Sequence, residues 1–169
     1  MRSDGLREYI EQLAERNEVK KVTVSCNPEL EMCEIAHRMF SAGSDQVLLF
    51  TDTGTEYPVA MNLYASEKRL LASMHAKSFE ELQQRISSLF DTITQPKKGF
   101  SAKWHTLSSL YSLAKLLPRA ISGKAPCQER IERSPDLTKL PILKSWPHDG
   151  GRFITLPMVI TKDIETGKR

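Results

Sequence analysis

Residues 19–50 read VKKVTVSCNPELEMCEIAHRMFSAGSDQVLLF. The first part alternates β-branched residues with others, which predicts a strand over Val19–Cys26 with Val22, Val24 and Cys26 on one face. The last part, Val47–Phe50, is a continuous apolar run, typical of a strand buried on both faces. The residues between them carry a helical pattern. This strand–helix–strand order predicts an α/β fold.

The predicted helix between the strands has a clear start and end. Asn27-Pro28-Glu29 supplies a cap, a proline suited to the first helical position and an acid near the positive dipole end. Gly43 is expected to close the helix in the left-handed conformation. The apolar positions recur at helical spacing, namely Met32, Ile35, Ala36, Met39 and Phe40.

A helix is predicted ahead of this stretch, over Leu6–Arg16. Ser3 or Asp4 is its expected N-cap, and Asn17 is expected to stop it. Its apolar face consists of Leu6, Tyr9, Ile10 and Leu13.

Three elements are predicted after the stretch. Pro58–Leu63 is expected to form a second central strand, and Ser66 and Ser78 are each expected to begin a helix. Ser78-Phe-Glu-Glu81 fits the capping-box pattern. The stripe that we expect the second helix to bury contains Phe79, Leu82, Ile86, Leu89, Phe90 and Ile93.

These elements predict three regions along the chain. Residues 1–94 form a small α/β layer domain. Residues 95–135 form a basic helical linker, which opens with the boundary Gln95–Gly99 and carries an amphipathic helix over Ser101–Leu117. Residues 136–169 begin another domain.

The composition indicates which classes of protein this chain resembles. The apolar and charged fractions, 40% and 27%, are those of a globular protein, and no apolar run reaches the roughly 20 residues of a membrane span. The N-terminus lacks the apolar stretch of a signal peptide. Three cysteines without zinc-type spacing favour a reducing cytoplasm.

Charge is distributed unevenly. Residues 1–92 carry 10 cationic and 15 anionic side chains, whereas residues 93–145 carry 10 and 3. This basic segment, with Trp104 and Tyr111, has the composition of a nucleic-acid surface. Both aromatic residues lie on the apolar stripe of the predicted helix, so burial against another element is favoured and a nucleic-acid partner is not expected.

The C-terminal region predicts a strand over Phe153–Thr161 and a turn over Lys162–Lys168. The sequence stops before a returning strand. A single hairpin arm leaves apolar side chains and backbone groups without partners. We therefore expect this chain to be the front part of a larger protein.

Three short motifs are candidate sites. Ser122-Gly123-Lys124 resembles part of a phosphate loop, but Pro118 and Ala125 replace the required glycine and hydroxyl residue. Cys33 and His37, one helical turn apart, could supply half of a metal site or could be ordinary helix residues.

His148-Asp149 could be an acid–base pair, although Asp149-Gly150-Gly151 also has the composition of a turn. Thr155 is a hydroxyl residue in an otherwise apolar strand. It could face solvent or orient a ligand in a pocket, and the pattern alone does not choose between them.

Several segments, in this order, resemble UbiD-type decarboxylases. Together they extend over nearly the whole chain, which makes the resemblance far more specific than any single motif. They are Leu6–Lys21, Asn27–Ala36, Lys124–Glu129, Asp136–Leu143, Trp146-Pro147, Asp149–Gly151, Ile154–Pro157, Thr161–Asp163 and Glu165–Arg169.

The resemblance implies a reversible, non-oxidative carboxy-lyase acting on an aromatic or α,β-unsaturated acid, such as a 4-hydroxybenzoate or a polyprenyl-hydroxybenzoate. It implies prenylated FMN, manganese and potassium as cofactors, and an FMN-binding split β-barrel of which residues 136–169 are the first strands. Thr155 is the cofactor-binding candidate. The resemblance assigns no catalytic residue and no metal ligand to this chain.

It also implies a homo-oligomer for the full-length enzyme. The alternative is a non-catalytic subunit or assembly module, completed by a partner chain that carries the rest of the barrel.

Overall fold

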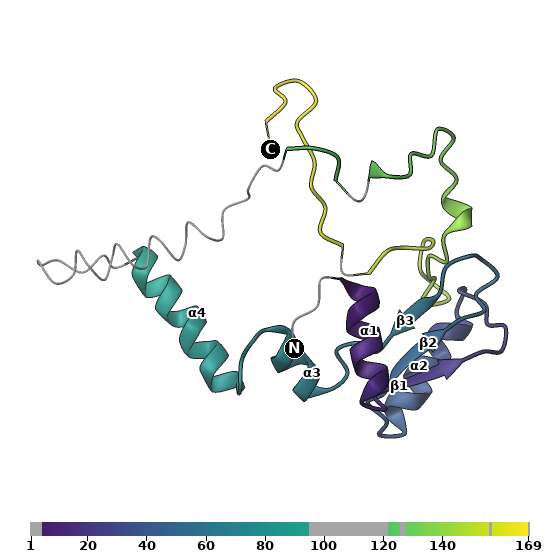
Figure 1. The fold of residues 1–169 in the computed structure, drawn as a ribbon, viewed down its shortest axis with the longest axis horizontal. Helices are drawn as coiled ribbons and strands as arrows, with labels where there is room; N and C mark the ends of the chain where they lie inside the picture. The colour runs from purple at the N-terminus through teal and green to yellow at the C-terminus, as the bar shows by residue number, and fades with distance from the viewer. Residues whose placement is uncertain (1–4, 95–121, 126–127, 156, 169) are drawn as a thin grey trace, which may run out of the picture. The chain divides into compact units, whose positions relative to one another are not determined.

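The computed structural model describes residues 5–94, 122–125, 128–155 and 157–168 of the chain. The chain divides into two compact units. One contains residues 2–67 together with residues 136–169, and the other contains residues 68–135. The predicted helix, strand, helix, strand, strand, helix, helix order is confirmed (Figure 1).

The first unit is built on a three-stranded sheet. Its strands are β1 (Val19–Val22), β2 (Val47–Phe50) and β3 (Val59–Met61), in the order β1-β2-β3. β1 pairs with β2 in parallel, and β2 pairs with β3 antiparallel. β2 is therefore the central strand, as its continuous apolar run predicted. β3 was predicted to be central, but it lies at the edge of the described sheet.

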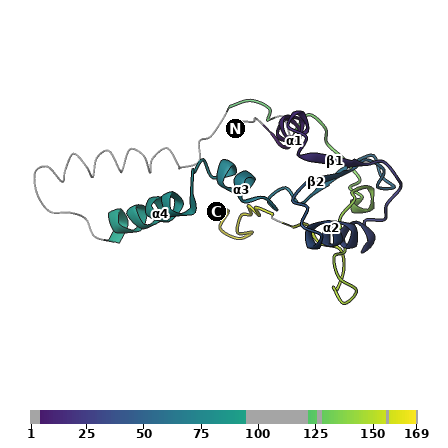
Figure 2. The same cartoon turned by 90° about the horizontal axis from the view of Figure 1, so that it is seen from below.

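Two helices cover the sheet from opposite sides (Figure 2). α1 spans Leu6–Glu15 and α2 spans Glu31–Ser41. The core on the α2 side contains Cys26, Met32, Ala36, Leu48 and Phe50, each at most 4% exposed. Leu143, from the C-terminal region, packs against this core as well.

The ends of α1 and α2 show which local signals were reliable. Asn17 has φ 59° just past α1, and Gly43 has φ 81° just past α2, so both predicted stops are confirmed. The N-cap position of α1 is Gly5, without a side-chain hydrogen bond. The predicted caps, Ser3 and Asp4, lie outside the described residues.

The start of α2 was predicted three residues too early, with Asn27 rather than Leu30 at the cap position. The Asn27 side-chain oxygen accepts from the Glu29 N–H (2.8 Å), which closes a separate turn ahead of the helix. Leu30 then takes the cap position with φ 69°. The cause is tertiary pairing: the Leu30 N–H donates to the Lys144 carbonyl (2.9 Å), and the Lys144 N–H donates to the Pro28 carbonyl (3.2 Å).

The first strand is also shorter than predicted. β1 ends at Val22, and Val24 is 66% exposed. Beyond Val22 the chain leaves the sheet, and the Cys26 N–H donates to the Asp52 carbonyl beyond β2 (3.1 Å). Cys26 still reaches the core, but as part of this connection rather than on a strand face with Val24.

The unit of residues 68–135 contains two described helices, with α3 (Glu67–Ser73) beginning at the boundary between the units and α4 spanning Phe79–Thr94. Both predicted starts are confirmed. The Glu81 N–H donates to the Ser78 hydroxyl (3.3 Å), which is one of the two bonds of a capping box. The Glu81 carboxylate accepts from the N–H of Lys77, one residue ahead of the cap (2.8 Å). The Arg85 guanidinium donates to the carbonyls of Met74 (3.0 Å) and His75 (3.1 Å).

The predicted burial of the α4 stripe is wrong for the described residues. Phe79, Ile86, Leu89 and Phe90 are 42–64% exposed. The spacing aligns these side chains on one helical face, but no described segment covers them. The predicted boundary Gln95–Gly99 and the predicted helix Ser101–Leu117 lie outside the described residues.

The predicted strand Phe153–Thr161 is not formed in its described residues, 153–155 and 157–161. Phe153 donates one backbone hydrogen bond to the Leu143 carbonyl (3.0 Å), and no described strand pairs with the residues that follow it. A strand needs a partner for its backbone groups, and sequence preference alone does not supply one.

The predicted turn Lys162–Lys168 is confirmed. The Asp163 carboxylate accepts from the Thr166 N–H (2.6 Å), the Thr166 hydroxyl (2.7 Å) and the Glu165 N–H (3.1 Å). Bonding to Thr166 and Glu165 lowers the pKa of Asp163. Gly167 has φ 66°, a conformation that glycine adopts without strain.

Candidate functional site

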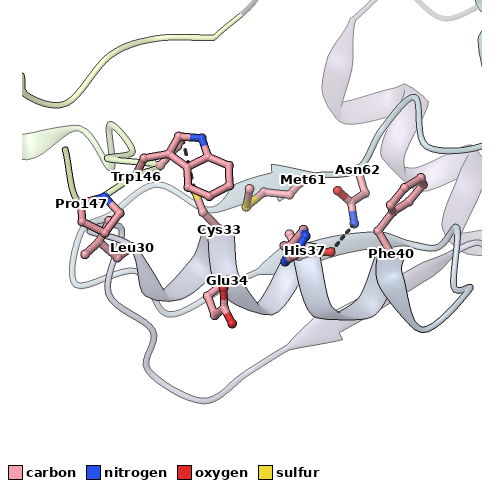
Figure 3. Close-up of a pocket in the computed structure, with 11 residues that line it drawn as sticks. Leu30, Cys33, Glu34, His37, Phe40, Met61, Asn62, Trp146 and Pro147 are labelled. Atoms are coloured by element: carbon pink, nitrogen blue, oxygen red, sulfur yellow. Dashed lines mark hydrogen bonds between the residues drawn. The ribbon is translucent and has the colours of Figure 1, made fainter. Parts of the chain in front are cut away.

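A pocket of about 630 Å³ lies along α2 in the first unit. Figure 3 shows Trp146 and Pro147 at the Leu30 end of α2, Phe40 and Asn62 at the other end, and Met61 between them. Three segments distant in sequence therefore build it: α2, the end of β3 and the turn at residues 145–147. The lining residues are Leu30, Cys33, Glu34, Ala36, His37, Phe40, Met61, Asn62, Ser145, Trp146 and Pro147.

The pairing of Glu29 with Lys144 positions the Trp146 side of the pocket. The two residues form a parallel bridge, and their side chains are 3.8 Å apart at the closest charged atoms. Arg152 also reaches the Glu29 carboxylate (3.6 Å). These contacts place Ser145 next to α2, where its hydroxyl is 3.5 Å from the Cys33 sulfur.

A turn fixes Trp146 itself. The Asp149 N–H donates to the Trp146 carbonyl (3.1 Å), and the Asp149 carboxylate accepts from the Trp146 N–H (2.9 Å). Pro147 follows Trp146 in this turn, where its fixed φ is favourable. The indole is 65% exposed and forms one wall of the pocket.

Two lining residues have positive φ angles, Leu30 at 69° and Asn62 at 61°. The Asn62 amide donates to the Ala36 carbonyl of α2 (3.3 Å), which joins the end of β3 to the helix (Figure 3). A leucine in this region is strained, and surrounding contacts must hold it there. The bond from the Leu30 N–H to Lys144 is one such contact.

The carboxylate and the imidazole that line the pocket already have partners. The Glu34 carboxylate is 2.6 Å from the Arg38 guanidinium, and the His37 ring is 3.5 Å from the Ser41 hydroxyl. The rest of the lining is mostly apolar. This arrangement can hold an apolar group, but it places no acid, base and nucleophile together around a reacting atom.

The structure brings two of the predicted site residues together. Cys33 and His37 both line the pocket. However, no group of three histidine, cysteine or carboxylate side chains that could hold a metal ion occurs in the described part of the chain. The pair thus remains two ligands short of a usual zinc site.

The other predicted residues lie outside the pocket. The Asp149 carboxylate bonds to the Trp146 backbone, so Asp149 has the turn role rather than a role paired with His148. Ser122, Gly123 and Lys124 are exposed, and Thr155 is exposed. Trp104 and Tyr111 lie outside the described residues.

Sequence reasoning missed the role of Phe40, Met61, Asn62 and Trp146 as pocket-lining residues. Phe40 and Met61 were predicted only as apolar positions of a helix and a strand. The signal that could have identified Asn62 is its residue type, because asparagine tolerates positive φ at the end of a strand.

Two family models match the chain. Residues 10–89 match the 3-octaprenyl-4-hydroxybenzoate carboxy-lyase N-terminal domain. Residues 119–169 match the 3-octaprenyl-4-hydroxybenzoate carboxy-lyase Rift-related domain. The chain belongs to the UbiD family.

Three relatives align with nearly the whole of this chain. An uncharacterised protein of Archaeoglobus fulgidus is 38% identical over 99% of the chain. Uncharacterised proteins of Synechocystis and Aquifex aeolicus are 32% and 33% identical over 96% and 97% of it. The chain spans about a third of the length of these relatives, 33–34%.

Solved structures show the UbiD-class fold in this region. The chain is similar to an evolved dimeric form of the UbiD-class enzyme HmfF from Pelotomaculum thermopropionicum, in complex with prFMN. The TM-score is 0.63 at 23% identity, over 98% of this chain and 34% of that one. An FMN complex of HmfF gives a TM-score of 0.60 at 23% identity, over 95% and 31%.

Proposed function

We propose that this chain is the N-terminal part of a UbiD-like carboxy-lyase. The reaction is the reversible, non-oxidative decarboxylation of an aromatic or α,β-unsaturated carboxylic acid. The supporting observation is the match of two carboxy-lyase domain models in sequence order, over residues 10–89 and 119–169. We further propose the cytoplasm as its location, in keeping with the free cysteines Cys26 and Cys33.

The proposed cofactor is prenylated FMN, with manganese and potassium. When bound, the flavin ring supplies an electron sink for the charge left on carbon as carbon dioxide departs. The described residues do not fit this group by themselves. The pocket presents the Glu34 carboxylate and no lysine or arginine side chain, which is unfavourable for a phosphate, and no metal-ligand cluster accompanies it.

Thr155 is the residue that we propose to contact the cofactor in the complete enzyme. Its side chain is exposed, between Phe153, which is 45% exposed, and Met158, which is 88% exposed. A single hydroxyl among apolar groups suits the orientation of one polar atom of a ligand. In the complete enzyme, Thr155→Val should weaken prenylated FMN binding, whereas Thr155→Ser should retain it.

The proposal divides the protein into residues 1–94, 95–135 and 136–169, the last being the first strands of the split barrel. A homo-oligomer is the proposed assembly of the full-length enzyme. Among the described helices, none combines the length and the apolar character that a membrane crossing requires.

A cofactor titration tests whether this piece acts alone. We expect the 169-residue chain, titrated with prenylated FMN and manganese, to show no saturable binding in the micromolar range. Saturable micromolar binding would contradict the proposal that this chain does not hold the cofactor by itself. A polypeptide that also includes the coding sequence downstream of Arg169 should bind the cofactor and release carbon dioxide from a 4-hydroxybenzoate-like or other unsaturated acid.

An assembly module is the second candidate function. The observation that favours it is the exposed apolar segment at Met158, Val159 and Ile160, whose side chains are 68–88% exposed. An extended segment of this kind can join the sheet of another chain by strand addition. A stop codon after Arg169, followed by a separate gene whose product copurifies with this chain, would favour the module. A continuous reading frame would favour the single-chain enzyme.

A further inference from the structure

The walls of the pocket along α2 are fixed by bonds within the chain. Asp149 holds Trp146 through both its backbone N–H (2.9 Å) and its carbonyl (3.1 Å). At the other end of the pocket, the Asn62 amide donates to the Ala36 carbonyl (3.3 Å). Because these walls are already in place, a molecule that binds between them does not need to order the protein first, which favours binding.

Leu30, which also lines the pocket, occupies a strained turn. Its φ of 69° and ψ of −43°, with the Glu31 N–H donating to the Glu29 carbonyl (2.8 Å), are close to those of the rare γ-turn with positive φ. Such conformations persist only where surrounding contacts hold them, and they cluster at ligand-binding sites. The bond from the Leu30 N–H to the Lys144 carbonyl therefore holds this end of the pocket in its strained form.

Large apolar side chains remain exposed at both ends of the pocket. Trp146 is 65% exposed and Phe40 is 56% exposed, and Figure 3 shows Cys33 and Met61 between them. The cavity, about 630 Å³, lies within the range of about 300–1,000 Å³ that is typical of small-molecule sites. Because aromatic rings pack favourably against one another, this surface suits a flat aromatic ring.

The charges around the pocket favour a neutral ligand. Among the described residues that line it, none is a lysine or an arginine, so an anion would lack a partner. The positive end of α2 lies on this side, but Glu31 and Glu34 in the first turn already meet it. The Glu34 carboxylate is in turn paired with Arg38 (2.6 Å), which reduces the attraction for a cation.

One polar group can orient such a ligand. The Ser145 hydroxyl, next to Trp146 in the chain, accepts from the Cys33 thiol (3.5 Å), and a hydroxyl that accepts one bond can still donate another. We propose that this pocket binds a neutral aromatic molecule that carries one hydroxyl or carbonyl oxygen. The inference does not use the proposed decarboxylation, and it predicts that aromatic carboxylates bind poorly here.

Two probes that share a ring system and differ in charge test this proposal on the full 169-residue chain. At pH 7, 2-naphthol is neutral, whereas 2-naphthoate is ionised. Titration with 2-naphthol should shift the amide NMR signals of Leu30, Cys33 and Trp146 in a saturable way. The Kd for 2-naphthoate should be at least about tenfold higher, because its carboxylate finds no partner.

A charge variant checks the reason for this selectivity. Glu34→Gln should strengthen 2-naphthoate binding and leave 2-naphthol binding unchanged. Two results would overturn the proposal. One is binding of 2-naphthoate to the parent chain as tightly as 2-naphthol. The other is a set of 2-naphthol shifts confined to the exposed apolar residues of α4, which would show that the ring adheres to any apolar surface.

Aromatic variants locate the ligand within the pocket. Trp146→Ala should weaken 2-naphthol binding about tenfold. The matched control is Phe79→Ala, because Phe79 is also an exposed aromatic residue, 45%, but does not line the pocket. Its affinity for 2-naphthol should equal that of the parent chain. Phe40→Ala repeats the test at the other end, away from the Asp149 turn, should Trp146→Ala fail to fold.

Unchanged 2-naphthol affinity in Trp146→Ala, or in Phe40→Ala, would overturn the proposal. Sedimentation of the parent chain distinguishes a small ligand from a second copy of the protein. A dimer that dissociates on Trp146→Ala would show that another chain fills the pocket, and this result would also overturn the proposal.

Discussion

Asn17 ends α1 with φ 59°, a left-handed conformation that costs most L-residues about 1–2 kcal/mol. We predict that Asn17→Ala lowers the free energy of unfolding by about 1 kcal/mol, whereas Asn17→Gly maintains or raises it. The Asn17 carbonyl, which accepts from the Gln46 amide (3.3 Å), is present in all three chains. Urea unfolding followed by circular dichroism measures the difference. If both variants lost the same free energy of unfolding, the Asn17 side chain, rather than its φ angle, would be the source of the stabilisation.

Asp163 carries a pH prediction. Hydrogen bonds from Thr166 and Glu165 stabilise its charged form and lower its pKa, from an ordinary value near 3.8. The folded-state pKa is depressed, so the stabilisation is present above the unfolded pKa and is lost as the pH falls through the folded value. The turn at residues 163–168 should therefore persist at pH 5 and loosen in stronger acid.

Titration of the Asp163 side chain by NMR checks this prediction. Its midpoint should lie below that of an exposed aspartate without such bonds, and Thr166→Val should move the midpoint upward by removing the hydroxyl donor. An unshifted Asp163 midpoint would contradict the role of the turn hydrogen bonds.

At the scale of elements, the backbone contact between residues 28–30 and Lys144 should contribute measurably to the stability of the first unit, although it involves few residues. Lys144→Pro removes the N–H that donates to the Pro28 carbonyl, along with the ion pair to Glu29. We predict a loss of about 1–3 kcal/mol in the free energy of unfolding. Hydrogen exchange should also speed up at the Leu30 amide, which donates to the Lys144 carbonyl.

The matched control is Lys144→Ala, which retains the backbone N–H and removes only the ion pair. Since the Glu29 side chain is 45% exposed, Lys144→Ala should lower the free energy of unfolding by less than about 1 kcal/mol. If the two variants were equally unstable, the ion pair rather than the backbone contact would hold the segments together.

Arg85 is predicted to stabilise the end of α3. Arg85→Met should speed amide exchange in α3 while α4 remains helical, because the guanidinium donates to the Met74 and His75 carbonyls. The expected stability loss is about 1 kcal/mol. Gln84→Met, on the exposed face of α4, is the control. No change in α3 exchange with Arg85→Met would refute this role.

These elements show what sequence could and could not predict. Gly43, Asn17 and the Ser78–Glu81 pair determine helix ends through bonds within a few residues, and each prediction was confirmed. The start of α2 was misplaced because residues 28–30 form backbone hydrogen bonds with Lys144, which is more than 100 residues away in the sequence. The pocket was missed for the same reason, since Trp146 meets α2 only through that pairing.

At the scale of the whole molecule, the first unit joins residues 2–67 with residues 136–169. Leu143 packs against the core around Met32 and Phe50. We predict that the polypeptide 1–135 is less stable than the 169-residue chain by about 2–4 kcal/mol, because it lacks Leu143 and the Lys144 hydrogen bonds. Chemical unfolding of the two polypeptides measures the difference.

This measurement also tests the proposed division of the protein. If residues 1–94 form an independent domain, removal of residues 136–169 should leave the unfolding of the sheet unchanged. If the sheet instead loses stability when residues 136–169 are removed, the C-terminal region belongs to the same folding unit as the sheet. The family resemblance alone does not choose between these outcomes, because it concerns sequence order rather than packing.

The bridge between Glu29 and Lys144 has a consequence for synthesis of the chain. Ribosomes add about 5–20 residues per second, so residues 27–40 emerge on the order of ten seconds before their partner. Closing a loop of this length is slow compared with forming a local helix turn. Throughout that interval, the apolar surface at Phe40 and Met61 lacks the wall that Trp146 provides. Nascent chains should therefore be most vulnerable to aggregation before residue 144 is made.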